Sequence, residues 1–91
     1  MSDEMTVGPW ISRLRLRVDG GDLHVKRGGK RATVPLRSVR SVVLQSSGPG
    51  AHEMVLHGEG GPLTTVSLSN TTEADRGAVC EWVRGKVREH G

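Results

Sequence analysis

Apolar and basic side chains alternate strictly along residues 13–18, and this alternation constrains the fold more than any other feature of the sequence. A period of two is that of a β-strand with one buried and one exposed face. The alternation resumes after Gly20-Gly21, a pair that predicts a two-residue hairpin turn because both glycines can take a positive φ. A second pair, Gly28-Gly29, follows one strand later. The sequence therefore predicts an antiparallel meander whose register is set by two tight turns.

Further strands are predicted downstream. A third apolar row consists of Ala32, Val34 and Leu36, and strands are predicted at 37–45, 52–57 and 63–69, with loops at 46–50 and 58–62. Pro35 lacks a backbone N–H, which places its strand at a sheet edge. We count about six strands in this way.

After the last strand the apolar spacing changes to three and four residues, the period of an amphipathic helix. The apolar stripe consists of Ala78, Val79, Trp82, Val83 and Val87. It predicts a helix over about 71–89, with Asn70 or Thr72 as the N-cap. The predicted fold class is α+β, mainly β: a meander of about six strands forming a small open barrel or two packed sheets, closed by the C-terminal helix. We expect a flexible tail at 1–9 and a single domain at 10–91.

This order of elements resembles that of the pleckstrin-homology-like superfamily, especially its compact bacterial members. The residues that carry the resemblance are Leu23-His24-Val25, Val34-Pro35-Leu36-Arg37-Ser38-Val39, Val42-Val43-Leu44, and Asn70-Thr71-Thr72-Glu73-Ala74 before Trp82. The pattern covers residues 10–89 and consists of hydrophobic spacing, not of a sequence fingerprint. The resemblance implies two near-orthogonal sheets with seven strands in total, one more than we count, and a helix that caps the barrel.

The resemblance also implies a binding module. Members that hold phosphoinositides use basic residues around the loop joining their first two strands. The loop in that place is predicted to be Asp19-Gly20-Gly21-Asp22, which is short and acidic and argues against such a site here. Bacterial relatives are more often oligomerising or protein-binding domains.

Positive charge is concentrated in one region. Residues 10–40 hold nine Lys and Arg against two Asp, a net charge of +7 in a chain whose total is +3. With both turns two residues long, Arg15 faces Lys26 and Lys26 faces Arg31, beside a second row that contains Arg17. Like charges placed directly opposite each other destabilise a sheet, which favours a bound anion on this face. The alternative is a solvated face whose long basic side chains prevent aggregation.

Residues for catalysis or metal binding are not apparent. The four His do not cluster, and His52 and His57 would lie on opposite faces of one strand. Cys80 is the one cysteine and is predicted at the flank of the helical apolar stripe, as a packing thiol. With no Phe, no Tyr and two Trp, the chain predicts one thin hydrophobic layer and no deep cavity. We expect no enzyme activity, no metal or other cofactor and no small-molecule substrate.

Two functions remain open. The first is a non-catalytic interaction domain that acts through a protein partner or self-association, with Val34, Pro35 and Leu36 as the partner edge. The alternative is an anion-binding module that docks on nucleic acid or on anionic lipid headgroups. Its candidate residues are Arg15, Arg17, Lys26 and Arg31. The first ten residues lack an apolar run and no stretch of 18 apolar residues occurs, so we expect a cytoplasmic protein.

Overall fold

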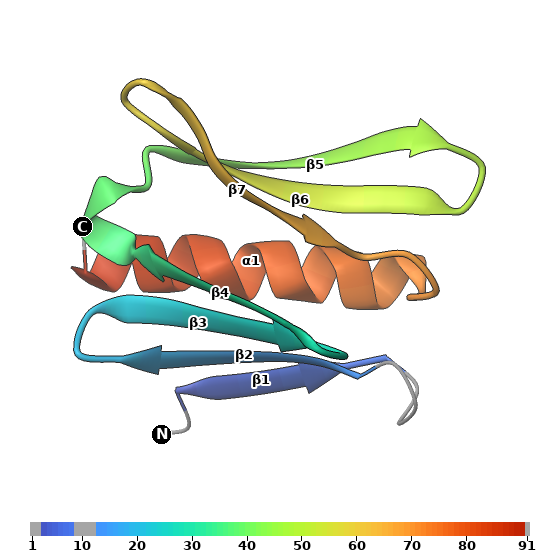
Figure 1. The fold of residues 1–91 in the computed structure, drawn as a ribbon, viewed down its shortest axis with the longest axis horizontal. Coiled ribbons are helices and arrows are strands. Elements are labelled where there is room, and N and C mark those ends of the chain that lie inside the picture. The colour runs from blue at the N-terminus through green and yellow to red at the C-terminus, as the bar shows by residue number, and fades with distance from the viewer. Residues whose placement is uncertain (1–2, 9–12, 91) are drawn as a thin grey trace.

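The computed structural model describes residues 3–8 and 13–90, which form seven strands in two antiparallel sheets and one long helix (Figure 1). Sheet A has the order β1-β2-β3-β4 and sheet B the order β5-β6-β7. The elements are β1 (Glu4–Val7), β2 (Leu14–Asp19), β3 (Asp22–Arg27), β4 (Lys30–Pro35), the 3-10 helix η2 (Leu36–Ser38), β5 (Ser41–Gly48), β6 (Ala51–Gly58), β7 (Gly61–Ser67) and α1 (Glu73–His90). The predicted fold class, two packed sheets closed by a C-terminal helix, is confirmed.

The two glycine pairs form the predicted turns. Gly20 and Gly21 both have a positive φ, as a type I′ turn requires, whereas in the second turn only Gly28 does, as in type II′. The resulting pairs are Asp19 with Asp22 and Arg27 with Lys30. The predicted register of the first three long strands is therefore confirmed.

The expected tail at 1–9 is wrong for Glu4–Val7, which form β1 at the edge of sheet A. The strand is anchored by a hydrogen bond from the Val18 amide to the Asp3 carbonyl, at 2.8 Å, and by Val7, which belongs to the core. A strand of four residues has too little periodicity to be read alone, and only its pairing with β2 stabilises it. Residues 1, 2, 9–12 and 91, including the expected domain start at residue 10, lie outside the described residues.

Sheet B has tighter turns than the sequence predicts, and its strand boundaries are shifted. β5 extends to Gly48 and β7 begins at Gly61, so that the expected loops at 46–50 and 58–62 are mostly strand. Positive φ angles at Gly50 and Gly61 allow these short reversals. At the other end, β5 begins at Ser41 and not at residue 37, because Leu36–Ser38 form η2.

The helix lies between the two sheets in Figure 1 and packs against β5, η2 and β1. The hydroxyl of Thr72 accepts a hydrogen bond from the Asp75 amide at 3.1 Å, which decides between the two predicted N-caps. Val79 and Val83 are buried and Trp82 and Val87 pack against the core, as the predicted stripe requires. Ala78 is exposed and Cys80 is buried, so the prediction is wrong at these two residues. Two facing layers bury a wider arc of the helix than a single layer would. Among the described residues, no helix has the length and apolar content needed to cross a membrane.

One core joins both sheets and the helix. Its members are Val7, Leu14, Leu16, Val18, Leu23, Val25, Val34, Leu36, Val39, Val42, Met54, Leu56, Val66, Leu68, Val79, Cys80 and Val83. Lys86 is buried beside it, where its ammonium pairs with Asp3 at 2.9 Å and with Glu89 at 3.4 Å and lies 5.5 Å from the centre of the Trp82 ring. These contacts compensate for burying the charge. Lys86 thus links the start of the chain to the end of the helix.

Candidate anion-binding site

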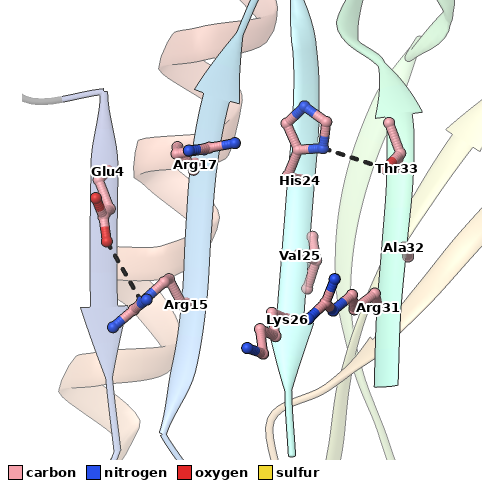
Figure 2. Close-up of a pocket in the computed structure, with 9 residues that line it drawn as sticks. All are labelled: Glu4, Arg15, Arg17, His24, Val25, Lys26, Arg31, Ala32 and Thr33. Atoms are coloured by element: carbon pink, nitrogen blue, oxygen red, sulfur yellow. Dashed lines mark hydrogen bonds and ion pairs between the residues drawn. The ribbon is translucent and has the colours of Figure 1, made fainter. Parts of the chain in front are cut away.

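The outer face of sheet A carries two parallel rows of polar side chains, because every second residue of its strands points away from the core. In one row Arg15 pairs with Lys26 and Lys26 with Arg31. In the other, Arg17 pairs with His24, which pairs in turn with Thr33. Figure 2 shows both rows side by side on β2, β3 and β4. The face predicted from the sequence is therefore assembled as expected.

Among residues 3–8 and 13–90, few negative groups lie beside these cations. Arg15 Nε lies 3.4 Å from Glu4 Oε1, but both side chains are about half exposed, so water and salt weaken their attraction. Among the residues that the structure describes, Arg17, Lys26 and Arg31 form no ion pair. Neighbouring side chains on paired strands lie about 5 Å apart, so the charges of this face repel one another.

Glu4 was not among the candidate residues, because residues 1–9 were expected to form a tail. Its carboxylate reaches Arg15 from β1, at the edge of the face (Figure 2). The alternation of β2 gives no indication of this neighbour, since β1 pairs with β2 across a connection whose residues 9–12 are not described.

The face is hollowed. A shallow depression of about 480 Å³ is lined by Glu4, Arg15, Arg17, His24, Val25, Lys26, Arg31, Ala32 and Thr33. His24 Nδ1 and Thr33 Oγ1 are 3.2 Å apart, which holds the imidazole along the sheet. Guanidinium groups present planar sets of N–H donors that match the oxygens of phosphate and carboxylate groups. The chemistry of this hollow is that of anion binding by exposed donors.

The predicted partner edge has a different environment. Val34 and Leu36 are core side chains, 4% and 0% exposed, whereas Pro35 between them is exposed. The side chains of Val34 and Leu36 are therefore turned away from any partner, and this edge offers mainly its backbone. β4 does lie at the edge of sheet A, as Pro35 predicts.

Cys80 lies in the core, apart from the residues that line the hollow. Cys80 is 2% exposed, and burial raises the pKa of its thiol, with Arg84 opposing that effect in part. A buried thiol with a raised pKa is a weak nucleophile. Over residues 3–8 and 13–90, no group of three or more His, Cys, Asp or Glu side chains is placed to hold a metal ion.

The additional strand β1 changes which loop joins the first two strands. Because β1 precedes β2, the turn at Asp19–Asp22 joins the second and third strands. The loop joining the first two strands is the connection from β1 to β2, of which residues 9–12 lie outside the described residues.

Comparison of the chain with protein-family models, with curated proteins and with solved structures finds no match. The function proposed below therefore depends on the geometry of the chain itself.

Proposed function

We propose that this chain is a non-catalytic binding module that docks on anionic lipid headgroups through the outer face of sheet A. The observation that carries the proposal is the row of Arg15, Lys26 and Arg31, three cations on paired strands. Among the described residues that line this hollow, Glu4 is the one carboxylate. Such a row costs folding free energy in the absence of a ligand. A bound anion removes that cost, since it provides the missing negative charge.

The shape of the chain also supports a binding module. Sheets of four and three strands followed by a helix have the strand count that the pleckstrin-homology-like resemblance implies. The candidate cations project from regular strands whose register is set by tight turns, so they form a preorganised surface. A cytoplasmic location, with access to the anionic inner leaflet of a membrane, is part of the proposal.

A lipid surface fits the face better than nucleic acid does. Proteins that bind single strands add aromatic side chains on which bases stack, and no Trp, Tyr or Phe is among the described residues that line the hollow. Double-stranded DNA is commonly read by a basic helix, whereas α1 carries both acids and bases and packs on the core. The face itself is a sheet surface with exposed cations, suited to an array of headgroups.

The test is co-sedimentation with vesicles of phosphatidylcholine, with and without phosphatidylserine, at low and moderate salt. Each cation near an anionic bilayer contributes about 1 kcal/mol. The double variant Lys26→Ala/Arg31→Ala is therefore expected to bind about 30-fold more weakly than the wild type. Binding should also fall as salt shortens the screening length.

The matched control is Arg37→Ala/Arg40→Ala, which removes the same charge from exposed residues in the connection between β4 and β5. Equal losses in the two double variants would mean that net charge, and not this face, drives binding. Salt-dependent binding to a DNA duplex without binding to vesicles would assign the face to nucleic acid instead.

A further inference from the structure

β4 and β7 are edge strands of their two sheets. Each of these strands pairs with one neighbour only, β4 with β3 and β7 with β6. Among the described residues, no backbone hydrogen bond joins β4 to β7. In Figure 1 both strands run obliquely from upper left to lower right, β7 above β4. Two sheet edges thus face a shared groove.

The hydrogen-bond phase of β4 identifies its free backbone groups. The Leu36 amide donates to the Gly21 carbonyl at 3.0 Å. In the alternating pattern of an antiparallel pair, the backbone N–H and C=O groups of residues 30, 32 and 34 therefore also face β3. The backbone groups of the intervening residues face away from β3. Arg31 and Thr33 therefore present both N–H and C=O at the free edge, and Pro35 presents a carbonyl alone.

The same reasoning applies to β7. The Leu68 amide donates to the His52 carbonyl at 2.8 Å, so the backbone N–H and C=O groups of Val66 also face β6. Those of Thr65 and Ser67 face away from β6. One of these outward groups, the Ser67 carbonyl, already accepts a hydrogen bond. The guanidinium of Arg27 donates to the carbonyls of Ser67 and Ser69, at 2.6 and 2.5 Å, and so closes one end of the groove.

The groove between the two edges has a distinctive lining. It has a volume of about 460 Å³ and is lined by Val25, Arg27, Lys30, Arg31, Ala32, Thr64, Thr65, Val66 and Ser67. Three of these residues are cations and three carry hydroxyls, and no carboxylate is among the described residues of the lining. Lys30 and Arg31 form no ion pair with any described residue. Unpaired strand edges beside uncompensated cations are suited to an extended acidic chain.

We propose that the groove between β4 and β7 binds an acidic peptide segment, which adds to the free edge of β4 as a further strand. Successive outward residues of β4 are about 6.7 Å apart, the repeat at which another strand presents its own N–H and C=O groups. A phosphate backbone accepts hydrogen bonds but donates none, so it would leave the carbonyls of Arg31 and Thr33 unpaired. The backbone geometry thus favours a peptide over a nucleic acid.

The side chains specify the peptide's pattern. A residue of the added strand that faces Arg31 lies on the outer surface, where a carboxylate is favoured. The next residue faces Ala32, which is partly buried against the core, and an aliphatic side chain is favoured there. The occupant is therefore an extended segment in which acidic and aliphatic residues alternate.

Fluorescence anisotropy with a labelled short peptide of alternating glutamate and valine tests the proposal. Two controls with the wild-type protein use the same peptide with an N-methylated backbone and a peptide of alternating lysine and valine. The first control retains the charge but lacks N–H donors, and the second reverses the charge. The proposal requires both to bind at least about fivefold more weakly. Equal binding of the N-methylated peptide would overturn strand addition.

Two protein variants locate the site. Thr33→Pro removes an outward N–H without affecting the ladder to β3 and should weaken binding about fivefold, whereas Thr33→Val should not. Thr65→Glu places a carboxylate in the groove from the opposite strand and should also weaken binding, relative to Thr65→Gln. Unchanged affinity in both Thr33→Pro and Thr65→Glu would overturn the proposal. So would a wild-type dimer that Thr33→Pro dissociates, since a second copy would then occupy the edge.

The two sites share Arg31, and Thr33 of the β4 edge also lines the hollow of the outer face, so Thr65 is the variant that separates them. None of the variants removes a cation from the outer face of sheet A, and the peptide is measured in the absence of vesicles. Thr65→Glu that weakens peptide binding and leaves vesicle binding unchanged would separate the two sites, since Thr65 lines the groove and not the hollow of the outer face.

Discussion

Arg27 is expected to contribute more to the stability of this chain than any exposed arginine, because its side chain holds sheet A against the end of β7. The guanidinium donates to two backbone carbonyls, of Ser67 and Ser69, about 40 positions further along the chain. Hydrogen bonds from a charged donor contribute about 1.5–3 kcal/mol each when well shielded, and less when water competes. One of these bonds is exposed and the other is partly buried. We therefore expect Arg27→Met to lower the free energy of unfolding by about 2 kcal/mol.

In a domain of this size such a loss lowers the melting temperature by about 10 °C. Arg27→Lys should lose about half as much, since an ammonium can reach one carbonyl but lacks the fork that holds both. The assay is urea unfolding followed by Trp fluorescence, with a thermal melt as a check. Arg37→Met is the control, because it makes the same exchange at an exposed residue of η2. The reasoning is refuted if Arg27→Met lies within about 0.5 kcal/mol of Arg37→Met.

Two further predictions concern stability. The hydrogen bond from Lys86 lowers the pKa of Asp3 below its usual value of 3.8, so the pair stabilises the fold above that value and the contribution is lost as the pH falls through the lowered pKa. Thermal melts should show Asp3→Asn less stable than the wild type at pH 7 and equal to it at the acid end, and a constant difference would contradict this assignment. Leu56→Ala removes a fully buried side chain of β6 and should cost about 3 kcal/mol in urea unfolding. Leu63→Ala, at a residue that is 45% exposed, should cost under about 1 kcal/mol, and similar losses in the two variants would show that the core is misassigned.

The candidate basic face was predictable because its determinants are local. Two glycine pairs set two tight turns, and each turn fixes the register of the strands on either side. Once the register is known, the alternation of side chains decides which residues share a face. Arg15, Lys26 and Arg31 could therefore be placed in one row from the sequence alone.

β1 and the boundaries of sheet B were not predictable in the same way. Glu4–Val7 contains two inward side chains, Met5 and Val7, too few to give a periodic signal. Its strand conformation depends on the ladder that β2 provides. Around Pro49 and Pro62 the sequence predicts loops that are longer than those observed. Pairing with β6 extends β5 and β7 into these turn-forming residues.

The helix shows how packing modifies a pattern. The spacing of apolar residues correctly predicted its position, because a period of 3.6 needs no tertiary information. The buried arc, however, includes Cys80 and Lys86 and omits Ala78. Which helical residues are buried depends on where β1, η2 and β5 contact the helix, and on Asp3 being close enough to pair with Lys86.

By itself the sequence determined the two hairpin turns, the row of cations that they align and the presence of a C-terminal helix. All three follow from steric and periodic rules that act within a few residues. Tertiary structure alone decided that Glu4 lies beside Arg15, that Arg27 reaches Ser67 and that the free edges of β4 and β7 share a groove. Those relations join parts of the chain that are distant in sequence, and they exist only because burial of one shared core brings the two sheets and the helix together.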